Sequence, residues 1–418
     1  MKKFDIAIVG AGPAGLSFAN SLSQSGLQIA IVELLDSNTI ENPAPDGREI
    51  ALTHLSLKIM QELGIWDKIP QQDISYIKKA HVVDGDSDYT MEFDTEKSDI
   101  KELGYMVPNY SIRKACYAAV KDKENVTILN NLKVTSILAG EKNSIICFEN
   151  GEQLKAKLVV GADSRFSATR RMMGISADMY DFGRCALVCR MSHEKSHQQT
   201  ASECFHYERT LAVLPLNDNI SSIVITLKAP DAAEVLAMSE AEFNADVAQR
   251  FGNKLGKMQL QGKRFNYPLV ATYANKFYAK RFALIGDAAV GMHPVTAHGF
   301  NLGLRSQNTL TKLIVAAHAK GEDFAATALL GKYNRQHRNV SRPLYLGTNG
   351  IVGLFTDDRP IAKLIRKGVL RAGNRIPILK KFITNQLTEE SNSSILKGIL
   401  PQSLSTSNNH SENKTSLS

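Results

Sequence analysis

A glycine-rich loop that follows an apolar segment near the start of the chain constrains the fold most. Residues 4–9 are largely apolar, and they run into Gly10-Ala11-Gly12-Pro13-Ala14-Gly15, which is followed by a helical pattern. Glycines at this spacing permit a tight turn, close approach of a pyrophosphate and close helix packing, and the N-terminus of the helix favours phosphate. A second strand over residues 28–32 completes a predicted βαβ unit for a dinucleotide.

An acidic residue at the end of the second strand strengthens this prediction. Glu33 lies 18 residues after Gly15, at the position where a carboxylate can accept hydrogen bonds from the hydroxyls of an adenosine ribose. We therefore predict cofactor contacts at five positions: Gly10, Gly12, Ala14, Gly15 and Glu33.

Two later motifs place an acidic residue after a strand. Asp163 lies in the run Val-Val-Gly-Ala-Asp-Ser-Arg-Phe-Ser at 159–167, and Asp287 begins the segment that leads to Gly-Phe-Asn-Leu-Gly-Leu at 299–304. With the first glycine loop, these motifs resemble the three fingerprints of the single-component flavin aromatic hydroxylases, also called class A flavoprotein monooxygenases. The run Asp-Gly-Arg-Glu-Ile-Ala-Leu at 46–52 and the ending at 299–304 look most like the ubiquinone-biosynthesis hydroxylases.

The resemblance, which runs from about residue 4 to about residue 385, implies an α/β fold. It comprises an FAD-binding Rossmann-like domain of the glutathione-reductase type, an inserted antiparallel β-sheet domain for the substrate, and C-terminal helices. We expect 1–75, 105–180 and 276–350 to form the discontinuous FAD-binding domain, and 76–104 with 181–275 to form the substrate-binding sheet. Basic helices are expected over 351–387, and a disordered, serine-rich tail over 388–418.

The resemblance also implies roles for individual residues. Asp287 would accept a hydrogen bond from a ribityl hydroxyl of noncovalently bound FAD, and the helix that begins near Gly299 would direct its N–H groups and dipole at the flavin pyrimidine. Asp163 would hold its loop between the flavin and nicotinamide functions. The other residues expected near FAD are Arg48, Arg113, Pro294 and Asn301.

Two positions depart from the pattern of that family. Its second fingerprint usually reads Gly-Ala-Asp-Gly, whereas this chain has Ser164 in the last place, so a turn that needs positive φ there is less comfortable. Before Gly299 the chain has Ala297 and His298 where relatives commonly have Gly and Gln. His298 is either a histidine that titrates near the flavin edge or, as we favour, an ordinary loop histidine.

The positive charge of the chain is local. The chain has 418 residues and a net charge of +8, and the segment 359–381 alone carries eight basic and no acidic residues. A neutral body with one basic stretch does not match a nucleic-acid groove, which needs charge spread over a binding face. Residues 360–372 fit an amphipathic helix suited to the inner face of a bacterial membrane, to an acidic protein partner, or to packing on the body with a solvated basic side.

The cysteines and the first residues also bear on the class of protein. The five cysteines include no C-x-x-C pair, which favours a reducing compartment and excludes a disulfide reductase. Met1 to Val9 are too short for a targeting segment, so a cytoplasmic protein is expected, peripheral on the membrane.

The expected reaction follows from the resemblance. NAD(P)H would reduce FAD, O2 would add to form a flavin hydroperoxide, and the ring of a polyprenylated phenol would attack its distal oxygen, within or outside a complex of ubiquinone-biosynthesis proteins. Two alternatives stay open: a hydroxylase of a small phenol or benzoate, and a noncatalytic flavin-binding assembly subunit. No catalytic acid or base is assigned, since core packing explains His206, Tyr207 and Tyr267 equally well.

Overall fold

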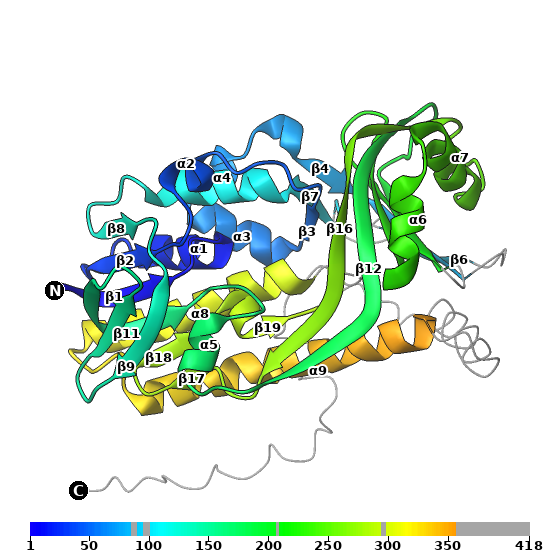
Figure 1. Ribbon diagram of the computed structural model, residues 1–418. Coiled ribbons are helices and arrows are strands. Elements are labelled where there is room, and N and C mark those ends of the chain that lie inside the picture. Colours follow the sequence, from blue (N-terminus) through cyan, green and yellow to red (C-terminus); the bar gives the residue numbers. More distant parts are fainter. Residues whose placement is uncertain (85–89, 95–100, 206–208, 294–297, 357–418) are drawn as a thin grey trace, which may run out of the picture.

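The computed structural model describes residues 1–84, 90–94, 101–205, 209–293 and 298–356, and its elements form two large sheets, one small sheet and a set of helices (Figure 1). The eight-stranded parallel-based sheet lies at one end of the molecule, and the eight-stranded second sheet lies at the other. The small sheet, of order β3-β7-β4, lies between them and comprises β3 (Glu49–Leu52), β4 (Ser75–Ile77) and β7 (Gly104–Pro108).

The first sheet has a parallel core in the order β18-β11-β1-β2-β8. Its inner strands are apolar along their length because both faces are covered: Ile6, Ala7 and Ile8 are fully buried, as are Ile29 to Ile31. Antiparallel strands extend its edges. The strands are β1 (Lys2–Val9), β2 (Ile29–Val32), β8 (Val126–Leu129), β9 (Val134–Ala139), β10 (Ser144–Phe148), β11 (Gln153–Gly161), β17 (Tyr278–Ala279) and β18 (Phe282–Leu284).

Helices pack on this sheet and on one another. α1 packs against α4 and α8, and α8 packs against the long α9, which extends toward the second sheet in Figure 1. The helices are α1 (Pro13–Ser21), α2 (Ser37–Glu41), α3 (His54–Glu62), α4 (Asn109–Val120), α5 (Ala168–Met172), α8 (His298–Ala319) and α9 (Thr327–Thr356). The expected helices and tail of 357–418 lie outside the described residues.

The second sheet has the order β19-β16-β12-β15-β14-β13-β5-β6 and is antiparallel except for the pair β13 and β5. Both segments that were expected to form an antiparallel sheet, 76–104 and 181–275, contribute strands to it. The strands are β5 (Lys79–Asp84), β6 (Thr90–Asp94), β12 (Ala177–His193), β13 (Thr200–Phe205), β14 (Thr210–Pro215), β15 (Ile220–Lys228), β16 (Met258–Ala274) and β19 (Val290–Gly291).

The two faces of the second sheet have different surroundings. Alternate residues of β15, Ile223, Ile225 and Leu227, are buried in a core with Val235 of α6 (Ala232–Ala237) and Phe243 of α7 (Glu240–Arg250). Val224 and Thr226, which alternate with these residues along β15, lie on the opposite face, toward the parallel sheet. Because side chains alternate across a strand, the sheet is left with one face for its own core and one inner face that can line a cavity.

The longest strands, β12 and β16, have 17 residues each and pair along most of their length. At one end their ladder begins with Ala177 opposite Ala274, and at the other it ends with His193 opposite Met258. The register shifts between Asp181 and Cys185, where Gly183 adopts a positive φ of 62°. The same two strands therefore contribute to the inner face and reach the side of the parallel sheet.

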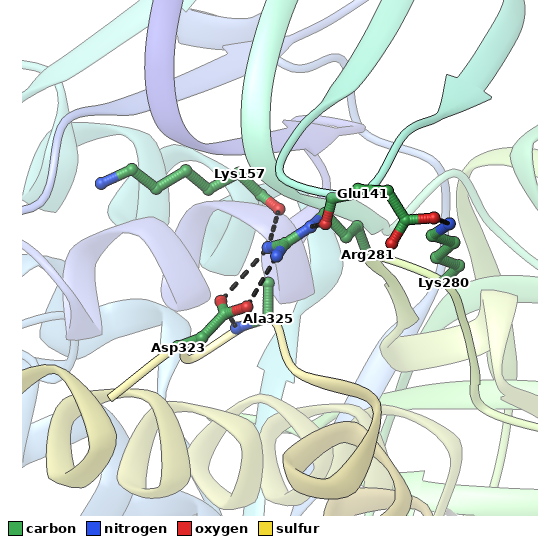
Figure 2. Close-up of polar contacts among 6 residues, drawn as sticks. All are labelled: Glu141, Lys157, Lys280, Arg281, Asp323 and Ala325. Atoms are coloured by element: carbon green, nitrogen blue, oxygen red, sulfur yellow. Dashed lines mark hydrogen bonds and ion pairs between the residues drawn. The ribbon is translucent and has the colours of Figure 1, made fainter. Parts of the chain in front are cut away.

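An arginine at the turn between β17 and β18 joins three segments (Figure 2). Arg281 makes a forked contact with Asp323, of the segment between α8 and α9, and its Nη2 lies 2.6 Å from the carboxylate. It also donates to the backbone carbonyls of Glu141 and Lys157. The hydrogen bonds from Arg281 lower the pKa of Asp323. This cluster attaches the helical layer to the edge of the parallel sheet.

Within the residues that the structure describes, none of the helices combines the length and apolar character that a membrane-spanning segment requires. The predicted domain boundaries stay predictions. Since β12 runs past residues 180 and 181, the boundary proposed there falls inside a strand.

The Arg281 cluster generates a stability prediction. We expect Arg281→Ala to lower the free energy of unfolding by about 1–3 kcal/mol, because several charge-assisted hydrogen bonds are lost at a largely buried side chain. Urea denaturation would measure the loss. Lys280→Ala is the matched control, since Lys280 makes an exposed ion pair with Glu141 that should contribute little to stability.

The pH dependence of this cluster has a defined sign. Asp323 has a lowered pKa in the folded chain, so its stabilising contribution is complete above the pKa of the unfolded chain, about 4, and is lost as the pH falls through the folded value. The difference in unfolding free energy between wild type and Asp323→Asn should therefore shrink below about pH 4. A difference that stays constant down to strongly acidic pH would contradict this assignment.

Candidate active site

A cavity of about 870 Å³ extends from the first glycine loop to the inner face of the second sheet. Its walls include the loops at the carboxyl ends of β1, β2, β11 and β18, which is the edge of a parallel sheet where ligands bind in folds of this type. Most of the predicted site residues line it, namely Gly10, Gly12, Ala14, Glu33, Arg48, Arg113, Asp163, Asp287 and Gly299. Gly15 and Asn301 do not line it, and Pro294 lies outside the described residues.

The three glycines of the first loop have different surroundings. Gly10 has a φ of +114°, and a Cβ there would lie 2.4 Å from the carbonyl oxygen of Ala162. A Cβ on Gly15 would lie 2.0 Å from the carbonyl oxygen of Gly10. At Gly12, by contrast, a Cβ would meet no protein atom within 4 Å. Gly10 and Gly15 are thus required for packing, whereas Gly12 leaves open space on the cavity side at the start of α1.

Glu33 closes this loop against the second strand. Its Oε2 accepts a hydrogen bond of 2.6 Å from the backbone N–H of Ala11, and its Oε1 accepts from the N–H groups of Leu34 and Leu35. The carboxylate is therefore fixed at the cavity wall. Because each carboxylate oxygen has two lone pairs, it can still accept from a ribose hydroxyl.

The second motif forms a loop that its own side chains hold. Asp163 accepts hydrogen bonds from the hydroxyls of Ser167 and Thr169 and from the backbone N–H of Thr169, at 2.6–2.9 Å. Ser164 adopts a φ of 73°. The backbone at Ser164 is therefore left-handed, at the position where the resembled family usually has glycine. This conformation is unfavourable for serine because its Cβ approaches the following carbonyl oxygen.

The second and third motifs meet through an arginine. Nη2 of Arg165 donates to Oδ2 of Asp287 at 3.2 Å, and its Nη1 donates to the carbonyl of Val270 on β16 at 2.7 Å. One such contact leaves acceptor capacity on the Asp287 carboxylate, which is about one-third exposed at the cavity.

The start of α8 lies at the cavity through Gly299 and Phe300. Asn301 is 1% exposed, and its side-chain amide donates to the carbonyl of Ala51 and accepts from the N–H of Thr53. Its side chain joins α8 to the end of β3 rather than lining the cavity. His298 is buried as the first residue of α8 and also does not line the cavity.

Arg48 is held at the cavity wall by three neighbours. Its guanidinium bonds the carboxylate of Asp46 at 2.6 Å and lies over the ring of Tyr267, 5.4 Å from the centroid. The hydroxyl of Tyr267 donates to the carbonyl of Asp46, and the amide of Asn109 donates to its carboxylate. Tyr267 is therefore part of a network that orients an arginine, a role that the sequence did not indicate.

Five ionisable residues that line the cavity were not among the predicted site residues: Lys133, Arg165, Glu49, Glu203 and His293. Glu49 and Glu203 line it, as does His293, which burial and the charge of Arg165 hold neutral by lowering its pKa to about 4. The carboxylate of Glu49 is 1% exposed and lies 2.7 Å from Nη2 of Arg190, and burial nevertheless raises its pKa to about 7. Glu49 directly follows Arg48 in the run at 46–52, and that position was the one available signal for it.

These features fit an FAD molecule. The open space beside Gly12 lies at the N-terminus of α1, where backbone N–H groups and the helix dipole favour a pyrophosphate, and Glu33 lies at the adjacent strand end. The start of α8 and Asp287 line the same cavity, which continues to the second sheet and so has room for a substrate beyond the cofactor.

Comparison with known proteins agrees with this reading. A family model described as an FAD binding domain matches residues 3–345. The chain belongs to the family of FAD-binding monooxygenases. The ubiquinone hydroxylase UbiM of Neisseria meningitidis is 49% identical over 388 residues, which cover 92% of this chain and 84% of that protein. The ubiquinone hydroxylase UbiL of Rhodospirillum rubrum is 31% identical, over 92% of this chain and 90% of that protein.

Solved structures agree on the fold. The p-nitrophenol 4-monooxygenase PnpA of Pseudomonas putida has a TM-score of 0.75 at 18% identity, over 93% of this chain and 99% of that one. The predicted α/β fold of this FAD-binding monooxygenase, with a Rossmann-like sheet, a largely antiparallel second sheet and C-terminal helices, is thereby confirmed. The predicted class of FAD-dependent aromatic hydroxylase is also confirmed. The assignment of single residues to FAD stays a prediction.

The contrast between two glycines gives a test of the cofactor site in this monooxygenase. Gly12→Ala should fold as stably as wild type without cofactor, yet bind FAD at least about tenfold more weakly, because its methyl group would occupy space that the pyrophosphate needs. Gly15→Ala should instead destabilise the fold by about 3 kcal/mol through overpacking. Urea denaturation of the apoprotein and fluorescence titration with FAD measure the two effects. Equal FAD affinity of Gly12→Ala and wild type would contradict the placement of the pyrophosphate.

The conformation of Ser164 predicts a stabilising substitution. Ser164→Gly should raise the free energy of unfolding by about 1 kcal/mol, because glycine adopts positive φ without the clash of a Cβ. Ser164→Ala, which keeps the Cβ, is the control and should bring no such gain. A Gly variant that is no more stable than the Ala variant would show that backbone strain is not the dominant effect at this position.

Proposed function

We propose that this FAD-binding monooxygenase hydroxylates the aromatic ring of a polyprenylated phenol in ubiquinone biosynthesis. The identity of 49% with the ubiquinone hydroxylase UbiM, over 92% of the chain, carries this conclusion. The ubiquinone hydroxylase UbiL and the 3-demethoxyubiquinol 3-hydroxylase of Escherichia coli, 26% identical over 90% of the chain, support it.

The residues of the cavity divide into two groups with different tasks. FAD, when bound, supplies the oxygen-transfer chemistry, with NAD(P)H as electron donor and O2 as co-substrate. Gly12 and Glu33 would hold its adenosine and pyrophosphate half, with Arg113 near the phosphates. Asp287 would accept from the ribityl chain, and the positive end of the α8 dipole would lie toward the flavin ring. The inner face of the second sheet would orient the substrate and exclude water.

Charge pairing in the cavity favours a neutral substrate over a benzoate. Three arginines at or beside it already have carboxylate partners: Arg48 contacts Asp46, Arg165 contacts Asp287, and Arg190 contacts Glu49. A fourth, Arg113, is the one we assign to the phosphates of FAD. A benzoate would need an arginine of its own, whereas a prenylated phenol needs apolar surface. Ala212, Leu214 and Val224 of the second sheet supply such surface.

The location and partners form a further part of the proposal. A substrate with a polyprenyl tail resides in the bilayer, so we place this monooxygenase on the inner face of the cytoplasmic membrane, in contact with a complex of ubiquinone-biosynthesis proteins. The basic segment 359–381, which lies outside the described residues, is the sequence feature suited to an anionic surface.

The proposal predicts substrate-stimulated turnover. Purified yellow protein should release all of its flavin on denaturation, and a short-tailed prenylated phenol should accelerate NAD(P)H oxidation and yield a product with one more ring oxygen, detected by mass spectrometry. Stimulation by a benzoate alone would point to the small-substrate alternative. Absence of stimulation by any phenol would point to a noncatalytic flavin-binding subunit.

The same preparation tests Asp287. Asp287→Ala should weaken FAD binding by roughly 1–3 kcal/mol, because a ribityl hydroxyl would lose its acceptor in a cavity. Asp122→Ala, an exposed position distant in sequence from the three motifs, is the control and should keep wild-type affinity. Unchanged FAD affinity in a folded Asp287→Ala protein would contradict the role given to the third motif.

A further inference from the structure

One acidic residue lies in a row of apolar side chains on the inner face of the second sheet. Glu203 of β13 pairs with Val82 of β5 and with Ala212 of β14, which in turn pairs with Val224 of β15. Cross-strand partners share a face, so Glu203 lies in a row of apolar side chains. Its neighbour Cys204 points the other way, into the core under α6 and α7.

The side chain of Glu203 faces the cavity that holds the cofactor-binding residues. It lines this cavity together with Ala212, Leu214 and Thr226 at the end formed by the second sheet. Among the described residues, no hydrogen bond or ion pair of its carboxyl group is found. Placing a carboxyl group among apolar side chains without a hydrogen-bond or ion-pair partner costs free energy. A purely structural role for this residue would bring no compensating stabilisation. Such a position is typical of a group that meets its partner when substrate binds.

The ionisation of Glu203 differs from that of its neighbours. Burial alone raises its pKa to about 8. The pKa of Glu49, beside Arg190, is about 7, and that of His293 is about 4. The remaining charged or titratable residues that line the cavity are Glu33, Arg48, Arg113, Lys133, Asp163, Arg165 and Asp287. Glu203 and Glu49 are therefore the two carboxyl groups there for which burial places the pKa near neutrality.

We propose that Glu203 is a catalytic residue that receives the phenolic hydroxyl of the substrate and takes its proton. The inference rests on the proposed function, which supplies the phenol. In this step the O–H bond of the phenol breaks, a bond forms between the proton and a carboxylate oxygen of Glu203, and the electron pair stays on the ring oxygen. The ring becomes more electron-rich at the carbons that are hydroxylated. When the C–H proton later leaves and the ring regains aromaticity, Glu203 returns its proton to the ring oxygen.

The first test compares Glu203→Gln with wild type. Gln has nearly the same shape but cannot take a proton, so kcat should fall about 10²-fold while FAD content stays the same. Because the carboxylate is the active form, kcat/KM of wild type should rise with pH up to about 8 and then level, and the Gln variant should lack this rise. Glu234→Gln, an exposed position on α6 beyond the opposite face of the sheet, is the matched control and should behave as wild type.

A second variant separates the two cavity carboxyl groups. Glu49→Gln removes the other group with a pKa near neutrality, and the rise in kcat/KM should persist in it, even if the rate is lower. Wild-type kcat and an unchanged pH profile in Glu203→Gln would overturn the proposal. Loss of the pH-dependent rise in Glu49→Gln, with its retention in Glu203→Gln, would assign the proton to Glu49 instead and would equally overturn it.

A binding measurement needs no turnover and so stands apart from the proposed function. Wild type should bind 4-hexylphenol about tenfold more tightly than its methyl ether, which cannot donate a hydrogen bond, and this ratio should approach one in Glu203→Leu. Leu suits the apolar row, so this variant should fold. A ratio that is the same in both proteins overturns the role of Glu203. If the ratio changes as expected but no prenylated phenol is hydroxylated, the proposed substrate is wrong and the recognition of a phenol by Glu203 is supported.

Discussion

The structure depends on backbone contacts that only glycine permits, and these contacts hold the three sequence motifs together. Gly15 lies against the carbonyl of Gly10, and Gly10 lies against the carbonyl of Ala162 in the second motif. A Cβ on Gly286, which begins the third motif, would lie 2.9 Å from the Cβ of Ala14. Segments far apart in the chain thus pack around one helix N-terminus. The candidate cofactor site follows from that packing, since the close contacts of Gly10, Gly15 and Gly286 surround the open space beside Gly12.

Charge in the cavity follows a simple pattern of local pairing. The pairs of Arg48 with Asp46 and of Arg190 with Glu49 each include one residue that lines the cavity, and Arg165 with Asp287 joins two of the motifs. Such pairs fix side-chain positions, and in each of them the carboxylate compensates the charge of its arginine. The carboxyl group of Glu203 differs because it faces the same cavity from a row of apolar residues, and this difference gives the substrate end its chemical character.

The sequence predicted those parts of the fold that depend on residues close together in the chain. The first βαβ unit was predictable because the strand, the glycine loop and Glu33 lie within 33 residues. Asn301 was expected to contact the flavin, yet its amide joins α8 to β3, a contact across about 250 residues that no spacing reveals. The pairing of β13 with β5 and the bond between Arg190 and Glu49 also join segments that lie far apart in the chain. Glu203 lies in a segment that was expected to belong to the second sheet, but the face of β13 that lines the cavity is determined by the packing of the whole sheet.

The continuous ladder of β12 and β16 has a mechanical consequence. These strands form a twisted ribbon roughly 55 Å long that belongs to the second sheet and also reaches the side of the parallel sheet. Because no flexible linker interrupts this ribbon, a rotation at one end of the cavity also moves the other end. The two ends therefore cannot rotate independently, as two domains joined by a hinge would. Compliance is instead concentrated where the ladder is irregular, around Gly183 and between Val188 and Arg190. Any adjustment of one end of the cavity to the other is therefore bending of the ribbon at these two irregularities.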